Sequence, residues 1–123
     1  MNKPFFTIVI PSLNEEINLP ILLESIHSQS YKEYEVVVVD CFSKDSTKEK
    51  VEKLMKKMPP LQFFQRKTKN VSQARNIGAS LAKGEYLIFF DADVEIGEPD
   101  FLNKIKKHIE EDRLDMLTVW NRP

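Results

Sequence analysis

The chain has 123 residues, a formal net charge of -1 and a charged fraction of 30%, which excludes the strong positive charge typical of a nucleic-acid-binding protein. Its one cysteine, Cys41, excludes an internal disulfide and a cysteine-rich zinc site. The length predicts one domain over residues 1–123, since globular domains cluster at roughly 100 to 150 residues. No apolar run approaches the roughly 20 residues that cross a bilayer. We therefore expect a cytoplasmic protein without a transmembrane segment, either free or at the inner membrane face.

The first half of the chain alternates between strand-like and helix-like patterns. Residues 5–10 are β-branched and aromatic and stop at Pro11, which predicts a strand covered on both faces. Apolar residues at helical spacing then predict a helix up to Ser30, with Pro20 tolerated in its first turn. Four consecutive valines within residues 34–40 predict a second strand, because β-branched side chains favour an extended backbone.

The second half continues this alternation. The expected elements, in chain order, are a helix that stops before Pro59, a weak strand over residues 61–65, a helix from Ser72 to Gly84, a buried strand over residues 86–90, a helix from Glu98 and a last strand over residues 116–120. The helix-length connections are those that right-handed parallel crossovers require. The pattern predicts an α/β fold with a doubly wound, mainly parallel sheet, in which ligands bind beyond the carboxyl ends of the strands.

Two carboxylates, Asp91 and Asp93, directly follow the strand predicted over residues 86–90. Carboxylate oxygens are preferred ligands of hard cations such as Mg²⁺, and two such groups side by side are unstable unless a cation neutralises them. An alternative is a solvated turn, in which Asp is common. The position of the pair, straight after a buried strand, favours the cation site.

Asp40 and Arg75 are the other charged residues placed to meet a ligand. Asp40 ends the second predicted strand, where it either caps the following loop or accepts hydrogen bonds from a base or a ribose. Arg75 lies in the first turn of a predicted helix, where it is either a surface residue or a partner for phosphate. The residues alone leave both alternatives open.

Four motifs follow one another over residues 11–93. They are Pro11-Ser12-Leu13-Asn14-Glu15-Glu16, then Val37-Val38-Val39-Asp40 with Ser43 and Asp45, then Ala74-Arg75-Asn76-Ile77-Gly78, then Phe90-Asp91-Ala92-Asp93. Each motif is short, but their order and spacing resemble glycosyltransferase family 2, whose members are inverting enzymes with the GT-A fold. The resemblance implies a Rossmann-like GT-A domain that binds a nucleotide-diphosphate sugar, and specifically the N-terminal, donor-binding half of such an enzyme.

The resemblance also implies roles for individual residues. The donor, a UDP- or GDP-linked sugar, would be bound by Pro11, Leu13, Glu15, Asp40, Arg75, Asp91 and Ala92. A Mg²⁺ or Mn²⁺ ion would be bound by Asp91 and Asp93, with Asp93 as its main protein ligand. Such a cation stabilises the negative charge that builds on the departing nucleoside diphosphate.

The chain departs from the family pattern in two ways. Many members have Asp-Asp-Gly-Ser after the second strand, whereas this chain has Asp40-Cys41-Phe42-Ser43. A positive φ costs Phe42 more than it costs glycine, so we expect this loop to follow a different path. The chain also stops before the half that carries the acceptor site and the general base in this family. We therefore expect a truncated donor-binding half whose catalytic base lies outside the chain.

Two other functions stay open, and no acceptor can be identified. A nucleotidyltransferase or another α/β nucleotide-binding enzyme could use the same acids, although the first strand is followed by neither a P-loop nor a G-x-G-x-x-G motif. A non-catalytic module could keep the fold without the reaction, and it would self-associate through an exposed sheet edge.

Overall fold

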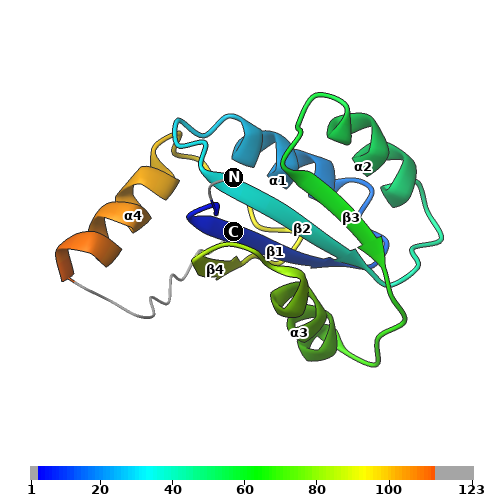
Figure 1. The fold of residues 1–123 in the computed structure, drawn as a ribbon. Coiled ribbons are helices and arrows are strands. Elements are labelled where there is room, and N and C mark those ends of the chain that lie inside the picture. Colours follow the sequence, from blue (N-terminus) through cyan, green and yellow to red (C-terminus); the bar gives the residue numbers. More distant parts are fainter. Residues whose placement is uncertain (1–2, 113–123) are drawn as a thin grey trace.

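The structure, a computed structural model, describes residues 3–112 (Figure 1). Strands and helices alternate along the chain. They are β1 (Phe6–Ser12), α1 (Asn18–His27), β2 (Tyr34–Asp40), α2 (Thr47–Met55), β3 (Leu61–Gln65), α3 (Val71–Leu81), β4 (Tyr86–Phe89) and α4 (Phe101–Asp112). The sequence predicts every one of these elements. The last predicted strand, over residues 116–120, lies outside the described residues.

The four strands form one parallel sheet in the order β3-β2-β1-β4. From β1 the chain steps outward to β2 and β3 through α1 and α2, and it then returns through α3 to place β4 on the other side of β1. Because parallel crossovers are right-handed, α1 and α2 cover one face and α3 covers the other (Figure 1). The sheet is therefore doubly wound, as predicted. Its order reverses at β1, where such folds bind their ligands.

Two apolar clusters hold the helices to the sheet. The larger includes buried residues of α1, α2 and α4 together with β1 and β2. The smaller joins Val37 and Val39 of β2 to Ala74 of α3. Gly78 lets α3 lie close to the sheet, because a Cβ at this position would collide with a side-chain carbon of Val9. The first turn of α3 is thereby fixed at the carboxyl edge of the sheet.

Pro11 does not end the first strand as predicted, because β1 continues through Pro11 to Ser12 alongside β2. The carbonyl of Val9 accepts a hydrogen bond from the amide of Phe90 (3.1 Å), so the backbone groups of Val9 face β4. The backbone groups of Pro11, two residues after Val9, face the same side of β1, but β4 has already ended there. The N–H that proline lacks is therefore not needed for the sheet.

The fourth strand is shorter and less buried than predicted. It ends at Phe89, and the side chains of Leu87 and Phe89 are 42% and 45% exposed. They lie opposite Thr7 and Val9 of β1, on the face that α3 covers. The helix packs on β1 and β2, however, and within residues 3–112 β4 is an edge strand beyond it. An apolar run in the sequence does not distinguish a central strand from an edge strand that is covered on one face.

Candidate functional site

A cleft of about 570 Å³ lies at the carboxyl edge of the sheet, beside β1 where the strand order reverses. Its volume falls in the range typical of small-molecule sites. Of the residues predicted to bind a donor or a metal, all except Asp40 line this cleft. They are Pro11, Leu13, Glu15, Arg75, Asp91, Ala92 and Asp93.

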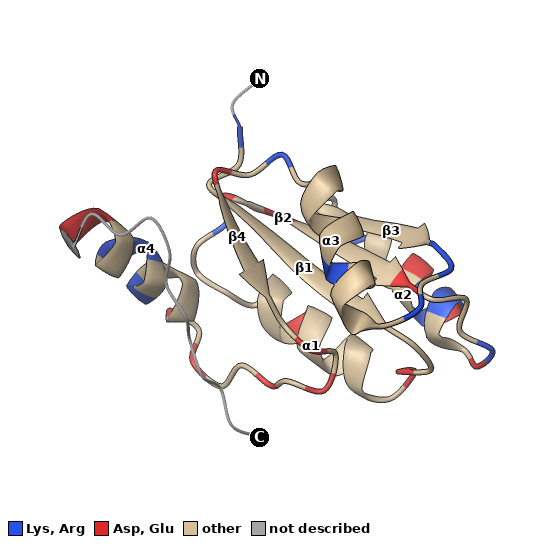
Figure 2. Cartoon of the chain, turned by 90° about the horizontal axis from the view of Figure 1, so that it is seen from below, with Lys and Arg blue, Asp and Glu red and all other residues tan. Residues whose placement is uncertain are grey.

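Charges of opposite sign reach the cleft from the two edges of the sheet. Asp91 and Asp93 lie on the loop between β4 and α4, where acidic residues gather (Figure 2). Lys69 lies on the loop between β3 and α3, where basic residues gather (Figure 2). This arrangement suits a ligand that combines phosphate with a cation, since each part finds groups of the opposite sign.

The turn that carries the two aspartates is fixed to the sheet at its start. Phe90 bonds to the backbone of Val9, and the amide of Val94 donates to the carbonyl of Asp91 (3.0 Å). Ala92, between the aspartates, is 5% exposed and packs in the larger core cluster. The buried methyl group thus anchors the turn, while both neighbouring carboxylates stay exposed.

Arg75 links α3 to this acidic turn. Its Nη2 donates to Oδ1 of Asp91 over 2.8 Å, in an ion pair whose side chains are 39% and 59% exposed. Its Nε is buried and has no hydrogen-bond partner among the described residues. Asp93 makes no hydrogen bond or ion pair within residues 3–112. One of the two carboxylates is therefore paired, and the other is available to a ligand.

The first turn of α3 also faces the cleft, through Asn70, Val71 and Ala74. Asn70, rather than the predicted Ser72, caps this helix, and its Oδ1 accepts from the amide of Gln73 (2.8 Å). Both residue types are good caps, so the sequence did not separate them. The amino end of a helix carries partial positive charge and favours anions, which adds to the charge of Arg75.

Asp40 ends β2 at the same edge but does not reach the cleft. Its side chain is fully buried, and it accepts hydrogen bonds from Oγ of Ser12 (2.7 Å), the amide of Ser43 (2.9 Å) and Nε2 of Gln65 (3.2 Å). The hydroxyl of Ser43 is a fourth donor. A carboxylate with all its acceptor sites in use has none left for a ligand. The geometry therefore favours the alternative role of Asp40, which is to hold the strand ends and the loop together.

The loops that follow β1 and β2 are joined by hydrogen bonds in both directions. The amide of Asn14 donates to Oγ of Ser43 (2.8 Å), and the amide of Lys44 donates to Oδ1 of Asn14 (2.8 Å). The amide of Glu15 donates to Oγ1 of Thr47 (3.0 Å). These contacts make one side of the cleft a single, internally bonded unit.

Phe42 adopts the positive φ that we expected the loop to avoid. Phe42 has a φ of 52°, in the left-handed region that glycine would occupy, and Asn14 on the neighbouring loop has a φ of 53°. The hydrogen bonds from Ser43 to Asp40 fix the turn on either side of Phe42. The surrounding contacts therefore hold the loop in this conformation at the expense of some backbone strain.

Several residues of the cleft walls are not among those predicted to bind a donor or a metal. These are Ser12, Cys41, Thr68, Lys69, Asn70, Val71 and Ala74. Most of them lie on the loops that follow β2 and β3 or in the first turn of α3. The predicted parallel topology could have indicated these residues, because all strands of a parallel sheet end at the same edge and their loops lie side by side.

A cation at this site would need ligands besides the side chains of residues 3–112. Within residues 3–112, no group of three His, Cys, Asp or Glu side chains is placed to hold a metal ion. Mg²⁺ commonly takes only one or two carboxylates and completes its shell with water and phosphate oxygens. Asp91 and Asp93 therefore fit a cation that is shared with a bound phosphate.

The sequence matches the family model described as glycosyl transferase family 2 over residues 7–122. An uncharacterized glycosyltransferase of Haemophilus influenzae is 32% identical over 106 residues, which are 85% of this chain and 34% of the relative. A PGL/p-HBAD biosynthesis glycosyltransferase of Mycobacterium bovis is 35% identical over 112 residues, which are 90% of this chain and 44% of the relative. The chain spans less than half the length of either relative.

Solved structures share the fold. S. aureus TarS in complex with UDP-GlcNAc is similar with a TM-score of 0.81 and 31% identity, over 88% of this chain and 32% of that chain. The mannosyltransferase PcManGT of Pyrobaculum calidifontis, in complex with GDP-Man and Mn²⁺, has a TM-score of 0.80 and 28% identity, over 89% of this chain and 33% of that chain. These similarities confirm the predicted GT-A fold. Since the family model covers nearly the whole sequence, this chain belongs to glycosyl transferase family 2.

Proposed function

We propose that this chain binds the donor of a glycosyltransferase, a sugar linked to a nucleoside diphosphate, together with a divalent cation. The observation that carries the proposal is the cleft, in which two exposed aspartates lie across from Lys69 and the first turn of α3. A diphosphate requires positive groups around its oxygens, and a cation requires carboxylates to hold it. The cleft offers both, and the whole enzyme would transfer the sugar to an acceptor.

Asp93 and Asp91 would hold the cation, and Arg75 would contact the diphosphate. The Arg75–Asp91 ion pair is half-exposed, and such pairs contribute only about 0–1 kcal/mol, so a ligand can replace either partner at small cost. When bound, the cation supplies a Lewis acid that stabilises the charge of the leaving diphosphate.

The loop after β1 would contact the nucleoside, through Pro11, Leu13 and Glu15. Its bonds to the loop after β2 give this side a fixed shape before any ligand binds. Asp40 contributes by holding that shape, and Cys41, which lines the cleft next to it, would meet the ligand in its place.

The base, the sugar and the cation are the finer parts of this proposal. One similar structure holds UDP-GlcNAc and another holds GDP-Man with Mn²⁺, so UDP- and GDP-linked donors are both candidates, and so are Mg²⁺ and Mn²⁺. The acceptor is open, and we propose that the general base lies outside this chain.

Isothermal calorimetry tests this proposal. UDP, GDP, UDP-GlcNAc and GDP-mannose, with UTP and GTP for comparison, are titrated with and without Mn²⁺ or Mg²⁺. We expect cation-dependent binding of at least one diphosphate, weakened about tenfold or more by Asp93→Asn, which corresponds to about 1.4 kcal/mol. Glu49→Gln, an equal charge change on α2 away from the cleft, should leave binding unchanged. Binding that ignores both the cation and Asp93, or a preference for a nucleoside triphosphate, would contradict the proposal and favour a nucleotidyltransferase.

The organisation and location of the protein stay predictions. Within residues 3–112, no helix has the length and apolarity needed to cross a bilayer. We propose a single domain that acts in the cytoplasm or at the inner membrane face. Self-association through the edge of β4, which carries the exposed Leu87 and Phe89, can be tested by sedimentation velocity.

A further inference from the structure

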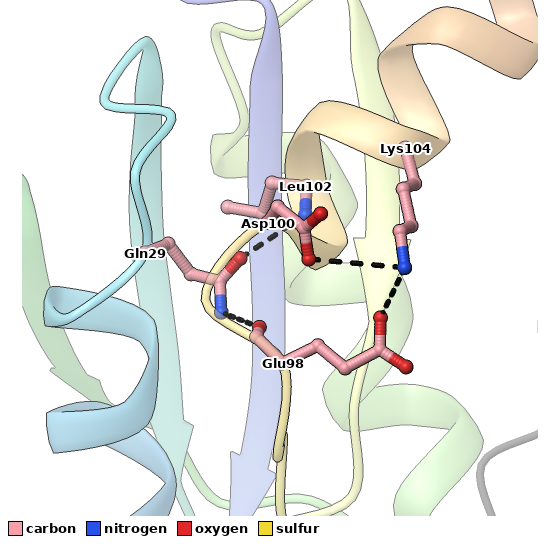
Figure 3. Close-up of polar contacts among 5 residues, drawn as sticks. All are labelled: Gln29, Glu98, Asp100, Leu102 and Lys104. Atoms are coloured by element: carbon pink, nitrogen blue, oxygen red, sulfur yellow. Dashed lines mark hydrogen bonds and ion pairs between the residues drawn. The ribbon is translucent and has the colours of Figure 1, made fainter.

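The loop between β4 and α4 carries both aspartates of the cleft and has a second anchor far from them. Its start is bonded to β1 through Phe90, and its middle is held by Ile96, which is 7% exposed in the larger core cluster. Its far end, at Glu98 and Pro99, meets the segment that follows α1 (Figure 3).

Gln29 makes this second anchor. Its side chain is 1% exposed, and the amide is used at both ends: Nε2 donates to the carbonyl of Glu98 (2.6 Å), and Oε1 accepts from the amide of Leu102 (3.1 Å) (Figure 3). The amide of Ser30 adds a bond to the carbonyl of Pro99 (2.8 Å). The Leu102 amide belongs to the first turn of α4, where amides lack partners within the helix, so Gln29 caps α4 from outside.

A short segment joins the two anchors of the loop. The aspartate turn lies at the carboxyl end of the sheet, whereas Gln29 follows α1, which returns the chain to the amino end where β2 begins. Only residues 94–97 lie between Asp93 and Glu98, and one of them, Ile96, is buried in the larger core cluster. A displacement of Glu98 would therefore reach the aspartate turn through a short, partly buried segment.

An outer ion pair on the same segment differs from this buried contact. The Nζ atom of Lys104 lies 2.6 Å from Oε2 of Glu98 and 3.8 Å from Oδ1 of Asp100 (Figure 3). All three side chains are more than half exposed. Exposed ion pairs are screened by water and contribute little, whereas a buried amide with both ends bonded is costly to lose.

We propose that Gln29 is a positioning residue of the cleft: by fixing Glu98 and the start of α4, it holds Asp91 and Asp93 where a cation and a diphosphate can share them. The proposal rests on the proposed function for its consequence in binding. The structural claim, that Gln29 restrains the aspartate turn, does not depend on the proposed function.

Two readouts on Gln29→Leu test the two parts. Hydrogen–deuterium exchange without ligand measures the restraint, and we expect peptides that cover residues 91–99 to exchange about tenfold faster. Calorimetry of UDP and GDP with Mn²⁺ measures the consequence, and we expect a loss of about tenfold, as for other residues that orient metal ligands. If Gln29→Leu does not fold, Gln29→Glu replaces it, since an ionised carboxylate keeps the acceptor for Leu102 and loses the donor to Glu98.

Two control variants separate positioning from general stability. Thr7→Val breaks a buried hydrogen bond at the start of β1, on the face of the sheet that α3 covers, and Lys104→Met removes the outer ion pair. Neither should change exchange over residues 91–99 or binding of the nucleotide with Mn²⁺. Unchanged exchange in the Gln29 variant, or the same change in Thr7→Val, would overturn the assignment of Gln29. An absence of Mn²⁺-dependent binding in the wild type, with faster exchange in the Gln29 variant, would instead overturn the proposed function and keep the restraint.

Discussion

The aspartates found at the ends of two strands, at the same edge of the sheet, differ in their burial and in their hydrogen bonds. Asp40, at the end of β2, is fully buried, and its oxygens are occupied by donors of the fold. Asp91 and Asp93, after β4, are exposed, and within residues 3–112 their only ion-pair partner is Arg75. A carboxylate at a strand end is thus structural or available to a ligand according to the donors that surround it. The loop after β2 supplies Ser43, and the turn after β4 supplies no comparable donor.

The largest expected effect is that of removing Asp40. Asp40→Ala leaves the donors of Ser12, Ser43 and Gln65 without their acceptor, and we expect a loss of about 3 kcal/mol in the free energy of unfolding. Urea unfolding followed by circular dichroism measures it. Asp93→Ala is the matched control at the exposed site, with an expected change of less than about 0.5 kcal/mol. Equal losses in the two variants would remove the distinction between the two strand ends.

Glu35, at the amino edge of the sheet, is a second buried carboxylate that the fold surrounds with donors. It accepts from Oγ1 of Thr7 (2.6 Å), the amide of Lys83 (2.6 Å) and Nε2 of Gln62 (2.8 Å). Burial opposes its ionisation, but these hydrogen bonds outweigh burial and lower the pKa of the carboxyl below its usual value. Glu35→Gln should therefore cost about 1–2 kcal/mol at pH 7.

The difference in the free energy of unfolding between wild type and Glu35→Gln should decrease as the pH falls. Because the pKa of Glu35 is lowered in the folded state, its contribution is complete above the ordinary glutamate pKa of about 4.3. It is lost as the pH falls through the lower, folded value. Urea unfolding of wild type and Glu35→Gln between pH 7 and pH 3, roughly spanning this window, should show curves that converge in acid. Curves that stay parallel would mean that the charge of Glu35 contributes nothing.

A smaller effect, of opposite sign, is expected at Phe42. This residue is 47% exposed and has a φ of 52°, so Asn, which tolerates the left-handed region, should relieve strain with little loss of burial. We expect Phe42→Asn to raise the free energy of unfolding by about 0.5 kcal/mol. Leu13→Asn, at a residue of similar exposure without a positive φ, should give no gain. A gain in both variants would mean that replacing an exposed apolar side chain by a polar one causes the effect, and not relief of backbone strain.

The smallest effect on stability is expected at the ion pair of the cleft. Arg75→Gln removes the partner of Asp91, but the pair is half-exposed, and we expect a change of less than about 0.5 kcal/mol. The same variant should weaken binding of UDP or GDP in the presence of Mn²⁺. A loss of stability comparable to that of Asp40→Ala would place the pair among the structural contacts.

The elements and their order could be predicted because their signals are local. Runs of β-branched residues and helical spacing depend only on neighbours in the chain. Whether Pro11 interrupts a strand depends on which strand lies beside it, and whether Leu87 and Phe89 are buried depends on how far α3 reaches across the sheet. Both depend on packing between distant segments, which one sequence does not specify.

The sequence predicts the charged residues of the candidate site better than the other residues that line it. Asp91, Asp93 and Arg75 stand out because charges at strand and helix ends have few structural uses in a core. Asp40 has the same appearance in the sequence, but Ser12 and Ser43, both close to it in space, occupy its oxygens. The basic loop over residues 66–70 became part of the site only through the parallel order of the strands.

The central claim is that Asp91 and Asp93 hold a cation together with a nucleoside diphosphate. Paramagnetic broadening by Mn²⁺ in amide NMR spectra of the labelled protein tests it most directly. With UDP or GDP present, trace Mn²⁺ should broaden first the signals of Asp91, Asp93 and Arg75, and Asp93→Asn should abolish this pattern, while signals around Glu35 stay sharp. Broadening that is centred elsewhere, or that is the same in Asp93→Asn, would contradict the account.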